Sequence, residues 1–164
     1  MSGVYVSSIL FDESIAEKGR VYWTIWHEVY DKLADPETVE QMTLARCQEG
    51  ARLYPWSQWI AKKDDRIVGF CDFDLYHGEI FSIGVLPEYR GQGVARRLME
   101  EILERLSAFD PITLWAPEKD PNAIRFYEHF GFRPCPDDHH VGCLMPVSAL
   151  TMRLWHSPND TQSN

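Results

Sequence analysis

The sequence predicts a mixed α/β fold, with one domain over residues 1–156 and a polar tail at 157–164. Residues 80–85 form a short run whose apolar side chains fall on both parities, which is typical of a central strand covered on both faces. Apolar residues then recur every fourth position from Val94 to Leu106, which predicts an amphipathic helix. A further strand and helix follow, so the chain contains at least one strand–helix–strand crossover.

The other elements come in order along the chain. The N-terminal half should hold a strand, two helices and a hairpin, at residues 4–10, 14–32, 35–50 and 59–75. The loop 54–57 precedes the hairpin, which turns at 63–65. The C-terminal part should hold a strand, a helix and a closing strand, at residues 112–115, 121–129 and 149–156. The helices at 35–50 and 121–129 both begin at an Asp-Pro pair. Asn122 is an alternative cap for the second of them, which stops at Gly131.

The turn between the central strand and its helix is suited to an anion. The first N–H groups of a helix lack partners within it, and the helix dipole adds positive charge there. Gly91 and Gly93 allow a phosphate to approach the backbone closely. Arg96 and Arg97 occupy the first turn, where acidic residues are normally favoured. The alternative is that these arginines are solvated and pair with glutamates four positions later.

Two common phosphate loops do not fit. No Gly-Lys-Ser/Thr is present for the NTPase loop, and Arg96 occupies the last glycine position of the dinucleotide fingerprint. Residues 90–95, RGQGVA, instead resemble the R/Q-x-x-G-x-G/A pyrophosphate loop of the GNAT superfamily of acyl-CoA-dependent N-acetyltransferases, with a V-x-P-x-x-R lead-in from Val85. Residues 122–132 resemble a second signature of that family, N-x-x-A-x-x-F-Y-x-x-x-G-F, although the alanine comes early.

This resemblance implies the GNAT fold: a central, mostly antiparallel sheet of six to seven strands, with splayed parallel fourth and fifth strands, flanked by about four helices. It also implies acetyl-CoA as co-substrate, lying between the splayed strands. Main-chain N–H groups near Val85 would stabilise the oxyanion, and Gly84 would mark a close backbone approach unless it only relieves packing. The implied cofactor-binding residues are Ile83, Gly84, Val85, Arg90, Gly91, Gln92, Gly93, Val94, Ala95, Arg96, Asn122 and Phe126.

Acyl transfer to an amine needs two proton movements, because the amine must lose a proton and the leaving thiolate benefits from gaining one. The resemblance assigns the acid to Tyr127, which aligns with the tyrosine of the family's Phe-Tyr pair. It suggests Glu79, six residues before Val85, as the base. Asp72 and Asp74 share a face of the neighbouring strand and are rival bases, or else a solvated face. Tyr127 could also be ordinary core packing.

The acceptor is expected to be a primary amine, attacked directly in a ternary complex. Aromatic and acidic residues in the regions that vary most in the family favour a small amine or polyamine; they are Trp23, Trp26, Tyr30, Asp31, Asp35, Tyr54 and Trp56. Protein N-terminal or lysine acetylation is the nearer alternative, and an acyl-CoA-binding regulator with little turnover is a different class. A homodimer is possible, because dimers are common in the family.

Charge and cysteine content restrict the remaining classes of function. The formal net charge of −9 argues against nucleic acid and mildly favours a cationic acceptor. No apolar run is long enough to cross a membrane, no secretory signal is visible, and four unpatterned cysteines suit a reducing cytoplasm. The cluster Cys135, His139, His140 and Cys143 lacks the paired spacing of a zinc site, so we expect a loop there and no metal.

Overall fold

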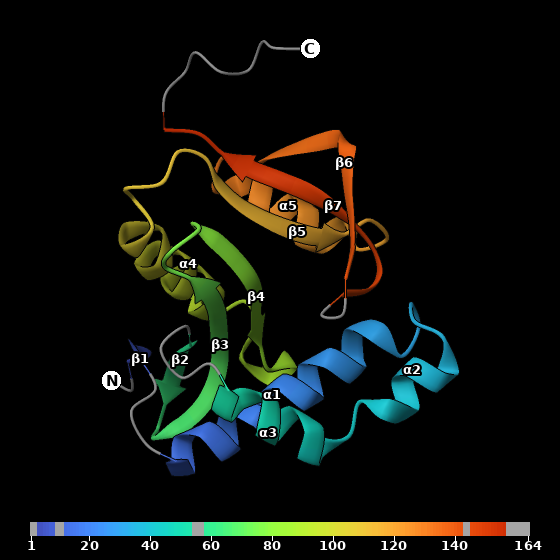
Figure 1. Ribbon diagram of the computed structural model, residues 1–164. Helices are drawn as coiled ribbons and strands as arrows, with labels where there is room; N and C mark the ends of the chain where they lie inside the picture. The colour runs from blue at the N-terminus through green and yellow to red at the C-terminus, as the bar shows by residue number, and fades with distance from the viewer. Residues whose placement is uncertain (1–2, 9–11, 54–57, 143–144, 157–164) are drawn as a thin grey trace. The chain divides into compact units, whose positions relative to one another are not determined.

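Hydrogen bonds join seven strands, within the described residues, in the order β1-β2-β3-β4-β5-β7-β6 (Figure 1). The computed structural model describes residues 3–8, 12–53, 58–142 and 145–156. Backbone contacts divide the chain into two units, Met1–Phe73 with Ser82–Arg105, and Asp74–Phe81 with Leu106–Asn164. Strand β4 contributes residues to both units. The expected tail at 157–164 lies outside the described residues, and the single domain over 1–156 stays a prediction.

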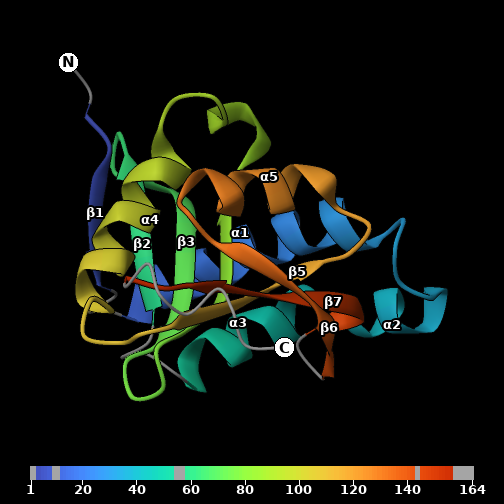
Figure 2. The same cartoon turned by 90° about the horizontal axis from the view of Figure 1, so that it is seen from above.

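The first unit holds the N-terminal strands and helices together with the helix after β4. Its elements are β1 (Tyr5–Ser8), α1 (Asp12–Tyr30), α2 (Pro36–Gln41), α3 (Leu44–Leu53), β2 (Gln58–Lys63), β3 (Arg66–Asp74, of which Asp74 falls in the second unit), the end of β4 (Glu79–Val85), the 3₁₀ turn η2 (Pro87–Tyr89) and α4 (Val94–Arg105). Strands β1, β2 and β3 lie side by side and antiparallel (Figure 2), as the predicted hairpin requires. Asp64 and Asp65 form its turn with positive φ angles of 51° and 60°.

Helices cover both faces of this part of the sheet. A Cβ on Gly84 would meet Ile25 of α1, whereas a Cβ on Gly69 would meet Leu98 of α4. Helix α1 packs against α3 on the first face (Figure 1). The buried residues of that face include Ile15, Val21, Ile25, Ala51, Ile60, Ile67 and Phe70. On the other face α4 buries Val94, Leu98, Met99 and Ile102, which confirms the stripe read from the sequence.

The single helix predicted for residues 35–50 is wrong, because the structure contains two. Helix α2 starts at the predicted Asp35 cap, whose carboxylate accepts from the Thr38 N–H at 2.9 Å, but it ends at Gln41. Thr43 then caps α3 through a bond from the Arg46 N–H at 3.2 Å. Side chains of α1 bind the Met42 carbonyl in the break, as described below. The described residues therefore contain five α-helices rather than about four.

The second unit holds the start of β4 with the C-terminal elements, which are β5 (Ile112–Pro117), α5 (Pro121–His129), β6 (Arg133–Gly142) and β7 (Met145–Leu154). Helix α5 begins at Asp120, whose carboxylate accepts from the Ala123 N–H at 3.1 Å, so Asn122 is not the cap. Gly131 follows with φ +94°, the predicted left-handed stop. The expected loop before the last strand is wrong, because β6 pairs antiparallel with β7; its register shifts between Pro134 and His139, where the prolines lie.

Strands β4 and β5 are parallel, as the crossover predicted. Their ladder consists of two pairs, Glu79 with Thr113 and Ile80 with Leu114, although β4 has seven residues. Such a short ladder is what splayed strands would give. Only Ile80 and Val85 of β4 are fully buried, so coverage on both faces is incomplete. Among the described helices none is both long and apolar enough to cross a membrane.

Candidate active site

The glycine turn before α4 has the open geometry that an anion requires. Gly91 and Gly93 adopt φ angles of +70° and +80°, which L side chains rarely adopt. A Cβ at either position would meet no atom of the described chain within 4 Å, so the space beside both is open. The Arg97 N–H bonds to the Gly93 carbonyl at 3.0 Å, which makes the N–H groups of Val94, Ala95 and Arg96 those of the first helical turn. Val94 itself is buried and anchors the helix start.

The arginines around this turn have partners inside the protein. Nε of Arg90 donates to the Val85 carbonyl at 3.0 Å, and its two terminal nitrogens bind the Glu28 carboxylate at 2.6 and 2.5 Å. Nε of Arg96 donates to Glu100 at 2.8 Å, so the alternative i,i+4 pairing is present for this residue. Arg97 is exposed at the same turn. Arg90 and Arg96 are therefore each paired with a carboxylate, and every nitrogen of Arg90 already has a partner.

Side-chain bonds also fix the turn from the hairpin side. The Lys63 ammonium donates to the Gln92 side-chain oxygen at 2.6 Å, and the Gln92 amide donates to the Glu88 carbonyl at 3.0 Å. Sequence reasoning missed both Lys63 and Glu28. They lie 29 and 62 residues from their partners, and no local pattern connects them.

Gly84 on β4 is tightly packed. A Cβ there would lie 3.0 Å from two carbons of Ile25 and 3.1 Å from the Phe70 ring, closer than ordinary contacts. This supports the packing explanation raised from the sequence. Its neighbours Ile83 and Val85 differ in burial, since Val85 is 5% exposed and Ile83 is half-buried.

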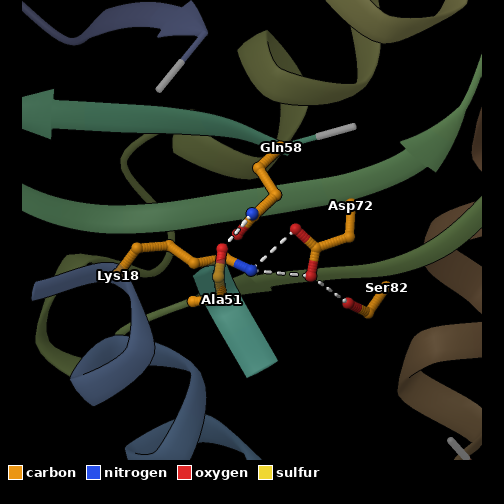
Figure 3. A network of polar contacts seen from close by, with 5 residues as sticks. All are labelled: Lys18, Ala51, Gln58, Asp72 and Ser82. Atoms are coloured by element: carbon orange, nitrogen blue, oxygen red, sulfur yellow. Dashed lines mark hydrogen bonds and ion pairs between the residues drawn. The ribbon is translucent and has the colours of Figure 1, made fainter. Parts of the chain in front are cut away.

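Asp72, one of the rival bases, belongs to a buried ion pair (Figure 3). Its two carboxylate oxygens lie 2.7 and 2.8 Å from the Lys18 ammonium, and the Ser82 hydroxyl donates to it at 3.3 Å. Lys18 is only 3% exposed. Gln58, beside this pair, donates to the Ala51 carbonyl. Both carboxylate oxygens already have partners within the protein, so this arrangement favours a structural role for Asp72.

Asp74, the other rival, is bound to the turn that follows β3. It accepts from Nδ1 of His77 at 2.6 Å and from the Tyr76 N–H at 2.7 Å. The hydrogen bond from His77 is the main reason that the pKa of Asp74 is lowered. The same bond raises the pKa of His77. Asp74 is therefore a poorer base than an ordinary aspartate.

The proposed acid and base, with two of the expected cofactor-binding residues, lie in the second unit. Tyr127 of α5 is 8% exposed, with its ring against Phe126 and Phe132 at centroid distances of 5.5 and 6.3 Å. Asn122, in the first turn, accepts from Arg125 at 2.6 Å. Glu79 is half-buried at the start of β4 and is paired in register with Thr113. The structure thus keeps Asn122, Phe126 and Tyr127 on one helix, as the motif implied.

Three of the residues expected to receive an amine, Trp23, Asp31 and Asp35, have bonds along α1 or at the two ends of α2. Nε1 of Trp23 and Nε2 of His27 both donate to the Met42 carbonyl, at 3.1 and 2.7 Å, and His27 also pairs with Asp31 at 2.7 Å. Trp26 is 3% exposed and stacks against Tyr30 with ring centroids 5.0 Å apart. Asp35 caps α2, and Tyr54 and Trp56 lie outside the described residues.

The residues that suggested a metal have separate partners. His139 pairs with Glu118, the ring of His140 packs on Trp115 at 4.8 Å, and Cys135 accepts from Arg153 at 3.5 Å. Cys143 lies outside the described residues. Within the described part of the chain, no three His, Cys, Asp or Glu side chains gather where they could hold a metal ion.

Comparison with known proteins places this geometry in one family. Residues 21–132 match the Acetyltransferase (GNAT) family. The [ribosomal protein bS18]-alanine N-acetyltransferase of Haemophilus influenzae is 30% identical over 105 residues, which cover 54% of this chain and 72% of the relative. The same enzyme of Escherichia coli is 26% identical over 113 residues, covering 58% and 76%.

Solved structures agree on the fold. The PaiA N-acetyltransferase of Thermoplasma acidophilum in complex with coenzyme A superposes with a TM-score of 0.75 at 15% identity, covering 94% of this chain and 99% of that one. The ribosomal-protein-S18-alanine N-acetyltransferase of Escherichia coli gives 0.66 at 16% identity, with 99% of each chain covered. The matched segment contains β4, the open glycine turn and α4. The chain therefore belongs to the GNAT family of acetyltransferases.

Proposed function

We propose that this enzyme transfers the acetyl group of acetyl-CoA to the α-amine at the N-terminus of a polypeptide, by direct attack in a ternary complex. The single observation that carries the cofactor half of the proposal is the open turn at Gly91 and Gly93, at the positive end of α4. The acceptor half rests on the curated relatives, whose names specify an alanine of ribosomal protein bS18. Alanine has no side-chain nitrogen, so its free amine is the α-amine of a chain N-terminus.

The cofactor would bind along β4 and the turn. The N–H groups of Gly91, Gln92, Gly93, Val94, Ala95 and Arg96 would bind the diphosphate. Ile83, Gly84 and Val85 would pair with the pantetheine and present an N–H group to the thioester carbonyl. Asn122 and Phe126 would contact the pantetheine arm. We assign Arg90 to holding the turn, because each of its three side-chain nitrogens already has a partner within the protein.

The acetyl transfer forms one bond and breaks another. The amine nitrogen attacks the thioester carbon, the new C–N bond forms, and the C–S bond breaks. Tyr127 would protonate the departing thiolate of coenzyme A, whose ordinary pKa is about 8.5. Glu79 would accept the proton of the amine through water. Asp72 and Asp74 are poor substitutes for Glu79, because Lys18 and His77 hold their carboxylates.

A small amine or polyamine remains the second candidate. The net charge of −9 favours a cationic acceptor. Against it, Trp23 and Asp35 already bind the two ends of α2, and Asp31 pairs with His27. Trp26 is almost fully buried. A peptide N-terminus is therefore the acceptor that we favour.

The test is acetyl transfer from acetyl-CoA to three acceptors: a peptide that begins with alanine, the same peptide N-terminally blocked but carrying a lysine, and spermidine. We expect transfer to the free N-terminus alone. Tyr127→Phe should lower kcat by about 10²-fold, within the range of a lost general acid. Tyr76→Phe, at a tyrosine 79% exposed, is the matched control and should change nothing. Transfer to spermidine alone would refute the proposed acceptor, and full activity of Tyr127→Phe would refute the proposed acid.

A further inference from the structure

The geometry points to a positioning role for Glu28: through Arg90 it fixes the end of β4 and the coenzyme turn in the place that acyl transfer requires. This inference rests on the proposed function, because it concerns the same site. Glu28 does not belong to either motif and lies 62 residues from Arg90 in the sequence.

The guanidinium of Arg90 is held by three hydrogen bonds. Nε donates to the carbonyl of Val85, the last residue of β4, at 3.0 Å. The two terminal nitrogens bind the two oxygens of the Glu28 carboxylate at 2.6 and 2.5 Å. A two-pronged pair of this kind fixes the plane of the guanidinium as well as its distance. With that plane fixed, Nε is held toward the Val85 carbonyl.

The backbone bonds of the neighbouring residues show which segment these hydrogen bonds hold in place. The Leu86 N–H bonds to the Val68 carbonyl of β3 at 2.8 Å, and the Arg90 N–H bonds to Pro87 at 3.2 Å. Residues 86–90 therefore form a tight connection between the strand and the glycine turn. Arg90 closes this connection by binding back across it to Val85. A shift of the guanidinium would move the strand end and the turn together.

Charge explains why Glu28 is needed as the partner. The side chains of Glu28 and Arg90 are 39% and 45% exposed, so solvent competes for an unpaired guanidinium. Without the carboxylate, Arg90 would be free to turn toward water or toward a bound phosphate. The pair therefore keeps Arg90 on the backbone carbonyl and away from the ligand.

The experiment compares Glu28→Gln with Glu101→Gln, using acetyl-CoA and acetyl-pantetheine as donors to the alanine-initial peptide. Glu101 is the matched control, because its side chain is 38% exposed and lies 4.0 Å from Arg105 near the far end of α4. Acetyl-pantetheine lacks the diphosphate, so it reports the position of Val85 without any effect on phosphate binding. Amide exchange at residues 90–95 is measured alongside.

We expect Glu28→Gln to lower kcat/KM about fivefold with both donors, to speed amide exchange in the turn and to leave Tm within about 2 °C. Arg90→Gln should give the same loss, and the double variant should lose no more, because the two residues act as one unit. The inference is overturned if Glu28→Gln matches Glu101→Gln with acetyl-pantetheine, or if only reactions of acetyl-CoA are affected. If calorimetry showed no binding of coenzyme A to the unaltered protein, the proposed function would fail, and this inference would fail together with it. Binding together with an unaffected Glu28→Gln variant would refute this inference alone.

Discussion

Replacing Gly93 should separate the backbone strain of the coenzyme turn from its steric role. Gly93 has φ +80°, and for an alanine the left-handed region costs about 1–2 kcal/mol. Because no atom lies within 4 Å of the added Cβ, this strain is the whole cost within the protein. For a chain of this size we expect Tm of Gly93→Ala to fall by about 2–8 °C.

Gly93→Asn distinguishes the two effects, since asparagine enters the left-handed region more easily than alanine. Its Tm should recover toward that of the unaltered protein. Its affinity for coenzyme A should not recover, because a side chain then occupies the space proposed for the diphosphate. We expect at least a tenfold increase in Kd for both variants, equivalent to about 1.4 kcal/mol. Calorimetric titration with coenzyme A and thermal denaturation measure the two quantities.

Gly50→Ala is the control for a glycine that needs no special conformation. Gly50 lies within α3, and a Cβ there would also meet no atom within 4 Å. Its replacement should stabilise the protein by about 0.5–1 kcal/mol and leave coenzyme A affinity unchanged. The reasoning fails if Gly93→Asn binds coenzyme A as tightly as Gly50→Ala, since the open space beside Gly93 would then not be the diphosphate site.

Three further predictions concern groups outside the turn. Lys18→Met should destabilise the fold by about 3 kcal/mol in denaturant unfolding, because it leaves the Asp72 carboxylate without its cation; Lys18→Met/Asp72→Leu should recover most of that loss. The His77–Asp74 pair should stabilise the protein mainly between about pH 4 and 6.5. Because the pKa of His77 is raised, the contribution of His77 is complete below about pH 6.5 and is lost as pH rises through its folded pKa. Because the pKa of Asp74 is lowered, the contribution of Asp74 is lost as pH falls in acid. His77→Gln should therefore lower Tm near pH 5.5 but not at pH 9, and an equal loss at both would contradict this. Burial raises the pKa of the Cys47 thiol to about 11, and burial also raises the pKa of the Cys71 thiol well above its usual range. A disulfide reagent should therefore label half-buried Cys135 well before either, and early labelling of Cys71 would be incompatible with the structure.

Local signals in the sequence predicted the elements whose ends are set by neighbouring residues. Asp120 with Pro121 and Gly131 delimit α5, and the four-residue spacing of buried side chains gives α4. The break between α2 and α3 could not be predicted this way, because Trp23 and His27 stabilise it from 15 to 19 residues away. Strand β6 was missed because Pro134 and Pro136 argue locally against a strand, whereas its pairing with β7 depends on residues further along the chain.

The candidate site shows the same division between local and distant information. The glycines of the turn are recognisable from their spacing, since positive φ and open space leave few other choices. The partner of Arg90 was not recognisable, because an ion pair between residues 28 and 90 leaves no pattern in either segment. For Asp72, position on a strand face suggested a base, whereas the buried Lys18 opposite it could be found only in three dimensions.

The requirement for Glu79 depends on the acceptor, which makes the base and the acceptor testable together. At pH 7.4 about a fifth of an α-amine of pKa near 8 is already deprotonated, whereas only about one in a thousand lysine-like amines is. If the acceptor is a polypeptide N-terminus, little is gained from a base, and Glu79→Gln should lower kcat/KM by no more than about tenfold at pH 7.4. The loss should shrink as pH rises to 9, because the amine then loses its proton to solvent. A loss near 10³-fold that persists at pH 9 would mean that Glu79 acts otherwise than as a base, or that the acceptor is a more basic amine.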